Sequence, residues 1–295
     1  MVGQDTKIPF VPTMVCAGIG GSVAETLTLP FDTVKVRLMT SGTHYKGMLD
    51  CGLKMAKEEG VASLWKGWTP GIHRQLVYCS LRLALYTEMS KWVIGEGNSS
   101  PTLLQKIQLG LLSGGVAISI ANPTEVVKIR IQGDMRNPGA APRYSGALNA
   151  YSTILKEETL KGFWVGCLPN VIRNSVINAA ELSAYFQIKQ WVLEYNLMED
   201  RLPCHFFCGF MAGFVAVVVG NPVDMMKTRI MNAKKGTGEA YKNIADCFLK
   251  TLKNEGFGAF YSGFFANVIR IGSWNIAMFV AFEALKKKYY DKFIA

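Results

Sequence analysis

Three short segments of the chain place a proline, an acid and a lysine at one fixed spacing. They read PFDTVKVRL at 30–38, NPTEVVKIRI at 122–131 and NPVDMMKTRI at 221–230. The acid follows the proline by two positions and the lysine follows the acid by three, so both charges lie on one face of a helix. The six charged residues are Asp32, Lys35, Glu125, Lys128, Asp224 and Lys227. Carboxylates and ammonium groups in this pattern form ion pairs, either locally or between helices.

The two arrangements of these charges have different consequences. A local pair on a solvated surface contributes only about 0–1 kcal/mol. Three-fold repetition allows a second arrangement, in which each acid meets the lysine of a neighbouring helix and the pairs close a ring. Desolvation offsets much of the attraction in a buried pair, so a ligand can open such a ring. We therefore expect a gate at one end of a central cavity.

The repeat extends beyond the charged segments. The segment HYKGMLDCGLKMAKEEG at 44–60 aligns with RYSGALNAYSTILKEET at 143–159 and AYKNIADCFLKTLKNEG at 240–256. Equivalent tyrosines in successive copies lie 99 and then 97 residues apart. This period is longer than the ~20–50 residues of solenoid repeats and indicates three copies of one unit in a single bundle. The copies are expected over residues 1–98, 99–198 and 199–295.

Each copy is predicted to contain two long apolar helices joined by a short amphipathic one. The first short helix would present Met48, Leu49, Leu53 and Met55 among polar residues. The long helices are expected over 11–39, 70–93, 104–132, 168–195, 205–231 and 264–288. Each exceeds the ~20 residues that a bilayer requires. The sequence therefore predicts an all-α membrane protein, a three-fold pseudo-symmetric bundle of six transmembrane helices with three short helices.

The distribution of basic residues supports a membrane protein. Lys and Arg concentrate in the segments 35–66, 124–163 and 223–258, which hold six, six and seven of them. The stretches 91–106 and 189–203 hold two each. This alternation is typical of basic loops that share one side of a membrane. The net charge of +10 therefore needs no nucleic-acid partner.

Ionisable residues inside the predicted membrane helices are candidates for ligand binding. They are Glu25, Arg74, Arg82, Arg173, Glu181 and Arg270. Arginines that converge on a buried cavity make an anion site, because guanidinium holds a carboxylate in a two-pronged hydrogen bond. Three of the arginines occupy equivalent positions, so bracing of helices or lipid binding is their alternative role. Arg82 has no basic counterpart, which indicates that it recognises the ligand.

The charged segments, the period and the signatures LWKG at 64–67, FWVG at 163–166 and FYSG at 260–263 resemble the mitochondrial carrier family. The resemblance covers nearly the whole chain. It implies a multi-pass protein of the mitochondrial inner membrane with three matrix helices, alternating access and cardiolipin near these signatures. It also implies that the acid of one odd-numbered membrane helix pairs with the lysine of the next, forming a gate on the matrix side.

Three segments resemble one branch of that family, which contains uncoupling proteins and the oxoglutarate and dicarboxylate carriers. They are SLRLALY at 80–86, PNVIRNSVINAAELSAY at 169–185 and NVIRIGSWNIAMFVAFE at 267–283. The resemblance implies substrate contacts at Arg82, at Arg173 with Asn174, and at Arg270. In uncoupling proteins the matching arginines are implicated in inhibition by purine nucleotides. Acids matching Glu25 and Glu181 imply proton coupling.

The chain departs from the family at its second gate, which is written aromatic-acid-x-x-Lys on each even-numbered membrane helix. The second helix has Thr87 and Ser90 at the charged positions, and the fourth has Phe186 with Lys189. Only the sixth retains both charges, as Glu283 and Lys286. We therefore expect an incomplete gate on the cytoplasmic side.

The expected function is transport of small organic anions, dicarboxylate or oxoglutarate-like, by exchange or together with a proton. One alternative is a fatty-acid-dependent proton leak inhibited by purine nucleotides. Another is a structural or accessory subunit docked on a larger inner-membrane complex, in place of a free monomer. An enzyme is not expected, since no serine–histidine–acid set, phosphate loop or metal cluster is visible. Apart from structural cardiolipin, no cofactor or metal is expected.

Overall fold

The computed structural model describes residues 10–41, 44–94, 103–134, 143–195, 197, 199, 202–233, 241 and 243–293. All regular elements in these residues are helical, which confirms the prediction of an all-helical fold. The long helices are α1 (Phe10–Thr40), α3 (Trp68–Ile94), α4 (Leu103–Gln132), α6 (Cys167–Glu194), α7 (Leu202–Asn232) and α9 (Phe264–Phe293). The short ones are α2 (Met48–Glu58), α5 (Ala147–Glu158) and α8 (Ile244–Glu255). A 3₁₀ turn follows each short helix, at Val61–Trp65, Leu160–Trp164 and Phe257–Tyr261.

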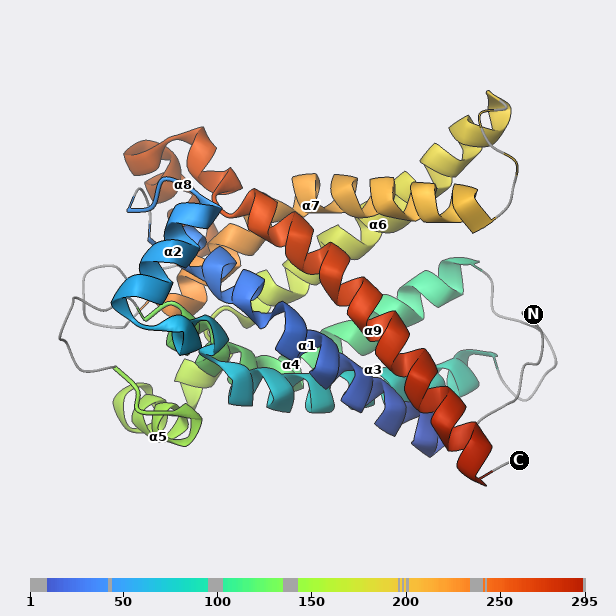
Figure 1. The fold of residues 1–295 in the computed structure, drawn as a ribbon, viewed down its shortest axis with the longest axis horizontal. Helices are drawn as coiled ribbons and strands as arrows, with labels where there is room; N and C mark the ends of the chain where they lie inside the picture. Colours follow the sequence, from blue (N-terminus) through green and yellow to red (C-terminus); the bar gives the residue numbers. More distant parts are fainter. Residues whose placement is uncertain are drawn as a thin grey trace.

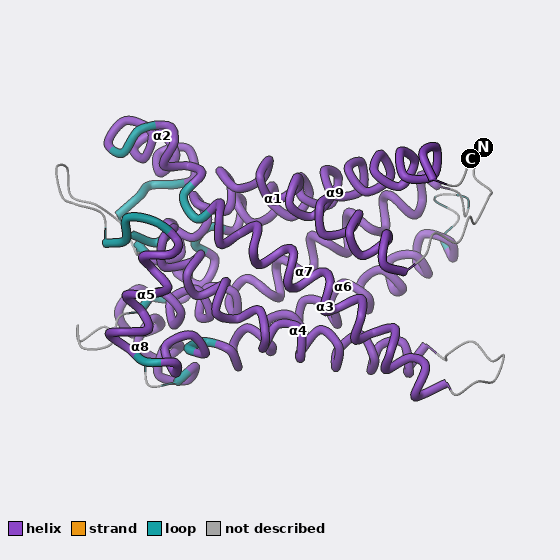
Figure 2. The backbone as a smooth tube through the Cα atoms, turned by 90° about the horizontal axis from the view of Figure 1, so that it is seen from below, coloured by secondary structure: helices purple, strands orange, loops and turns teal. Residues whose placement is uncertain are grey.

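The short helices gather at one end of the bundle, and the long helices run from there to the other end (Figure 1). The start of α1 and the end of α9 lie at that opposite end, where the long helices spread apart (Figures 1 and 2). Counted in chain order among the six long helices, α1, α4 and α7 are the odd-numbered ones, and α3, α6 and α9 are the even-numbered ones. Each odd-numbered helix contains a proline, Pro30 in α1, Pro123 in α4 and Pro222 in α7. We call the end of the bundle where the short helices gather the crowded end. It therefore holds the halves of the odd-numbered helices that follow these prolines.

Each short helix packs on the odd-numbered helix of its own copy. Cys51 and Met55 of α2 are buried with Val34 and Leu38 of α1. Equivalent clusters join α5 to α4 and α8 to α7. The apolar face predicted for α2 is only partly correct, because Leu49 is 76 % and Leu53 is 61 % exposed. The inner face instead uses Cys51, the small residue one turn before Met55.

Membrane-spanning character is visible in two stretches of the described residues. Phe207–Asn232 and Phe257–Lys286 reach mean hydropathies of 1.5 and 1.4 and are long enough to cross a membrane. Other long helices carry ionisable side chains within their predicted membrane spans, such as Glu25 in α1 and Arg82 in α3. Such residues lower the mean hydropathy of helices that line a polar interior.

Candidate functional site: an ion-pair ring between the repeats

The charged segments meet at the centre of the crowded end. The three ion pairs are Lys35 with Asp224 at 2.5 Å, Lys128 with Asp32 at 2.6 Å and Lys227 with Glu125 at 2.5 Å. Each pair joins two different copies of the repeat, and none of the six residues is more than 8 % exposed. We call these six residues the ion-pair ring. Each acid lies against the lysine of the next odd-numbered helix, so the interhelical arrangement forms and the local one does not.

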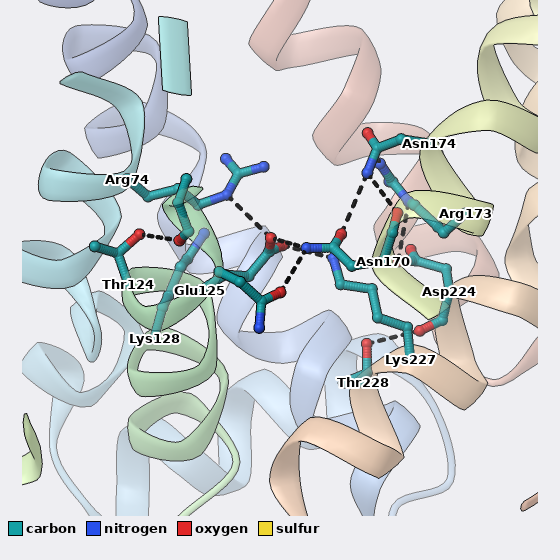
Figure 3. A network of polar contacts seen from close by, with 12 residues as sticks. Arg74, Thr124, Glu125, Lys128, Asn170, Arg173, Asn174, Asp224, Lys227 and Thr228 are labelled. Atoms are coloured by element: carbon teal, nitrogen blue, oxygen red, sulfur yellow. Dashed lines mark hydrogen bonds and ion pairs between the residues drawn. The ribbon is translucent and has the colours of Figure 1, made fainter. Parts of the chain in front are cut away.

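A layer of arginines adds a second cation to each acid. Nε of Arg74 lies 3.6 Å from Glu125, that of Arg173 lies 3.2 Å from Asp224, and that of Arg270 lies 2.6 Å from Asp32. Each arginine comes from the even-numbered helix of one copy and its acid from the odd-numbered helix of the next, the third copy being followed by the first. Figure 3 shows two of these contacts, Arg74 with Glu125 and Arg173 with Asp224. The three equivalent arginines therefore brace the ring in this conformation, which was their alternative role in the sequence.

Glu25 is a fourth carboxylate at the ring. It is 1 % exposed, it accepts a hydrogen bond from Nε2 of Gln75 at 2.9 Å, and it forms an ion pair with Lys128. Lys128 therefore has two carboxylate partners on α1. Six cations thus face four carboxylates in the ring and its arginine layer, which leaves an excess of two positive charges. A buried excess of this sign attracts anions.

Buried asparagines hold two of the three ring acids, and the sequence interpretation missed them. Asn170 donates to Glu125 at 2.6 Å and to Oδ1 of Asn122 at 3.2 Å. The amide of Asn122 in turn donates to the carbonyl of Phe163 at 2.8 Å. The acid is thereby tied to the even-numbered helix and to the 3₁₀ turn of its own copy.

The third copy repeats this arrangement and the first lacks it. Asn267 donates to Asp224 at 3.5 Å and to Asn221 at 3.2 Å. The equivalent positions in the first copy are Gly71 and Leu29. The signal was present in the sequence, since an asparagine precedes two of the three prolines and a leucine precedes the other.

The remaining predicted contacts lie around the arginine layer. Asn174 donates to the carbonyl of Asn170 at 2.9 Å and accepts from Arg173 at 3.4 Å. Arg82 is exposed, and its guanidinium donates to the hydroxyl of Tyr78 at 3.4 Å. The guanidinium carbons of Arg74 and Arg82 lie 5.5 Å and 5.9 Å from the centre of the Tyr78 ring. Arg82 is therefore not part of the ion-pair ring, but it contacts the same aromatic side chain, Tyr78, as Arg74 of the arginine layer.

Glu181 is exposed on α6, and no contact with the ring is seen for it in the described chain. The structure thus brings Glu25 to the ring and leaves Glu181 apart from it.

The residues predicted for a second gate lie far along the even-numbered helices. Glu283 is exposed, whereas Lys189 and Lys286 are half-buried. Among the residues that the structure describes, no ion pair joins Glu283 to either lysine. Glu88 and Lys91 pair with each other on the exposed surface of α3, at 2.6 Å. Within the described residues, Glu283 therefore makes no ion pair with the lysines of this predicted gate.

Three arginine–glutamate ion pairs join the short helices to the odd-numbered long helices that carry the ring. The pairs are Arg37 with Glu59 at 2.9 Å, Arg130 with Glu158 at 2.7 Å and Arg229 with Glu255 at 2.5 Å. Burial of Glu59 raises its pKa, but hydrogen bonds from Arg37 and Lys66 outweigh this effect and hold the pKa below its ordinary value. These pairs anchor the end of each short helix to the odd-numbered helix that carries the ring.

Comparison with known proteins agrees with this geometry. The sequence matches the mitochondrial carrier protein family over residues 6–97, 99–196 and 199–293. The chain belongs to the mitochondrial carrier family. It is therefore a multi-pass protein of the mitochondrial inner membrane, in a family of transporters and not of enzymes.

Individual relatives point to one branch. Mitochondrial uncoupling protein 1 of Arabidopsis thaliana is 43 % identical over 295 residues, covering 96 % of this chain and 94 % of that protein. Mitochondrial uncoupling protein 2 of the same plant is 40 % identical, with coverages of 96 % and 95 %. The putative mitochondrial transporter UCP3 of Sus scrofa is 41 % identical over 300 residues, with coverages of 97 % and 96 %. The similarity extends over the whole carrier unit in each case.

Proposed function

We propose that this carrier conducts protons across the inner membrane in a fatty-acid-dependent manner and is inhibited by purine nucleotides. The observation that carries the proposal is similarity to uncoupling proteins over 96 % of the chain. The excess positive charge at the ring is consistent with it, since fatty acids and nucleotides are both anions. The names of these relatives favour this activity over the expected dicarboxylate exchange.

In the proposed arrangement the six long helices cross the membrane and the three short helices face the matrix. The ion-pair ring is then the matrix gate. A space of only about 60 Å³ lies between the ring residues and the arginines. A space of this size admits water but not an organic anion. A fatty acid or nucleotide cannot pass, so the conformation is closed on the matrix side.

The arginines of the site would bind the anion head group. Arg173, with Asn174 beside it, and Arg270 offer charged donors directly above the ring, and Arg82 extends the set away from the ring. Because Arg173 and Arg270 already hold ring acids, a bound carboxylate or phosphate competes with those acids. Binding of the anion therefore loosens the ring, which couples ligand to gate. Glu25 and Glu181 are the proposed proton-carrying carboxylates.

Dicarboxylate exchange is the second candidate. The observation that favours it is the adjacent pair Arg173 and Asn174 on α6, which are joined by a hydrogen bond at the arginine layer. Together they present the guanidinium and amide donors that a carboxylate accepts.

Cardiolipin is proposed as a structural lipid beside the 3₁₀ turns. Indole Nε1 of Trp65 donates to the carbonyl of Thr26 at 3.2 Å, and that of Trp164 donates to the carbonyl of Ser119 at 3.1 Å. Both tryptophans remain more than 40 % exposed at equivalent positions. Such side chains suit the boundary between lipid tails and head groups.

Reconstitution in liposomes tests the proposed function. We expect proton flux that rises with added laurate and falls with added GDP. Arg173→Gln should abolish the inhibition, whereas Lys54→Gln should preserve it, because Lys54 lies in an exposed pair on α2. Exchange of labelled malate without proton flux would support the second candidate. Absence of both fluxes would overturn transport and favour an accessory subunit.

A further inference from the structure

The three boundaries between odd-numbered helices share a basic set of contacts. Each boundary has one ion pair of the ring. Each also has an arginine that donates through Nε to a main-chain carbonyl across the boundary. These bonds are Arg37 to Gln132 at 2.6 Å, Arg130 to Met231 at 3.0 Å and Arg229 to Met39 at 2.8 Å. The boundaries would therefore be equivalent if nothing else joined them.

Additional contacts are found at the boundary between α1 and α4. The side-chain amide of Gln132 donates to Asp32 and to the hydroxyl of Thr33, both at 3.2 Å. Lys128 binds Glu25 as well as Asp32. Arg37 makes a second bond across the boundary, to the carbonyl of Asp134 at 2.6 Å.

The other two boundaries have apolar residues at the positions of these polar side chains. Met231 and Met39 replace Gln132, and both are fully buried. Ile118 and Val217 replace Glu25 at five residues before the proline, and they are also buried. Lys35 and Lys227 consequently have one carboxylate partner each in the ring, whereas Lys128 has two.

Gly71 creates the space that Glu25 occupies. A Cβ atom at Gly71 would lie 3.5 Å from Cγ and Oε1 of Glu25 and 3.8 Å from Cε of Lys128. The equivalent residues are Asn170 and Asn267, whose amides reach the ring acids of their own copies. A side chain of that length at position 71 would compete with Glu25 for the same volume. The second and third copies have an asparagine–acid hydrogen bond within the copy. The first copy instead has an ion pair between Glu25 and Lys128 across the α1–α4 boundary.

We infer that the ring opens asymmetrically, with α1 and α4 held together by Glu25 and Gln132 while α7 moves away from both. Glu25 and Gln132 are then positioning residues that act on Lys128 and Asp32. Opening each of the other two boundaries breaks one ring ion pair, one arginine–carbonyl bond and one contact of the arginine layer, Arg173 with Asp224 or Arg270 with Asp32. The inference rests on the proposed role of the ring as the matrix gate.

Equivalent exposed positions on the short helices allow a direct test. Leu53 on α2, Ser152 on α5 and Leu249 on α8 are exposed at the same position of each copy. Each short helix is fixed to its odd-numbered helix by the arginine–glutamate pairs described above. Spin-labelled non-natural amino acids at two of these positions at a time report the three boundaries by pulsed electron paramagnetic resonance in lipid nanodiscs.

The expected result is a narrow distance distribution for the pair 53/152 and broader distributions for 152/249 and 53/249. Added laurate should broaden the latter two further. Three equal widths, or a broadest distribution for 53/152, would overturn the inference. The measurement needs no flux, so failure of the proposed proton conduction in liposomes is a separate result.

Exchanging Glu25 and Gln132 with the apolar residues of the other boundaries distinguishes a positioning role for these two residues from a general loss of structure. The double variant Gln132→Met with Glu25→Ile should broaden 53/152 to the width of the other pairs. Adding Met231→Gln should narrow 152/249, because the new amide faces Glu125 as Gln132 faces Asp32. Met231→Gln alone, in an otherwise intact ring, gives the same readout if the double variant does not fold. Unchanged widths in these variants would contradict the inference.

Discussion

Nζ of Lys35 and Oδ2 of Asp224 lie 2.5 Å apart, although 189 residues separate them along the chain. This buried pair joins the first copy of the repeat to the third and so closes the ring. Removing one partner of a buried pair leaves an uncompensated charge, which typically costs about 3–5 kcal/mol. The closed conformation should therefore depend strongly on this contact.

Asp224→Ala should destabilise the protein more than Lys35→Ala. Asp224 also holds Arg173 at 3.2 Å and accepts from Asn267, so its loss strands two cations. We expect a loss of about 3–5 kcal/mol in the free energy of unfolding for Asp224→Ala. Thermal unfolding in detergent, with a double-mutant cycle through Lys35→Ala, measures the coupling.

The matched control is Lys250→Ala on α8. Its partner is Asp246 at 2.8 Å, but the lysine side chain is 46 % exposed. An exposed pair contributes about 0–1 kcal/mol. Equal losses for the buried and exposed lysines would contradict the assignment of the ring as a stabilising closure.

Asn170→Leu should weaken the hold on Glu125 with little change in side-chain volume. The variant removes a hydrogen bond of 2.6 Å to the acid and leaves Oδ1 of Asn122 without its donor. A buried group left unsatisfied costs about 1–3 kcal/mol. Asn267→Leu should cost less, because its contact with Asp224 is 3.5 Å long. Chemical denaturation of both variants gives the order, and the reverse order would refute this explanation.

The ring itself was predictable from the sequence because its six charges repeat at a fixed spacing in three copies. Helix ends were equally predictable from the sequence, since α1 was expected over 11–39 and is found over Phe10–Thr40. Periodicity and composition decide such elements locally. The proposal of six membrane spans rests on the same reasoning.

The partners of the arginines could not be predicted in this way. Arg173 and Arg270 were expected to line an anion site, and in this conformation they bind Asp224 and Asp32. The distance from an even-numbered helix to the acid depends on helix packing, which sequence spacing does not encode. The sharing of Lys128 between two carboxylates likewise depends on the absence of a side chain at Gly71.

Acid should release α2 from α1 by protonating Glu59. Because the folded-state pKa of Glu59 lies below its ordinary value of 4.5, the paired carboxylate stabilises the fold above about pH 4.5. That contribution is lost as the pH falls through the lowered pKa. Glu59→Gln should therefore be less stable than the parent at neutral pH, and the difference in the free energy of unfolding should shrink as the pH falls below 4.5. Unfolding curves between pH 3 and 7 measure this difference.

Glu88→Gln provides the comparison for the pH experiment. Glu88 lies in an exposed pair on α3, with its side chain 61 % exposed. Its unfolding curve should follow that of the parent at every pH. A Glu59→Gln variant whose difference from the parent stays constant over this range would rule out the carboxylate as the titrating group.

Phe186→Asp should add an ion pair to the second gate, which the sequence predicts on the cytoplasmic side. Phe186 is 49 % exposed on α6 and occupies the position where the family pattern has an acid. If acids there pair with the lysine of the next even-numbered helix, the new carboxylate gains Lys286 as its partner once the cytoplasmic side closes. The variant should then populate the matrix-open conformation more, which a broader spin-label distribution between positions 53 and 249 would report. Phe186→Asn changes the same side chain without adding a charge, so it should leave the distribution unchanged. Equal shifts for both variants would show that loss of the phenyl ring, which contacts Tyr185 edge-on, and not a new ion pair, governs closure on that side.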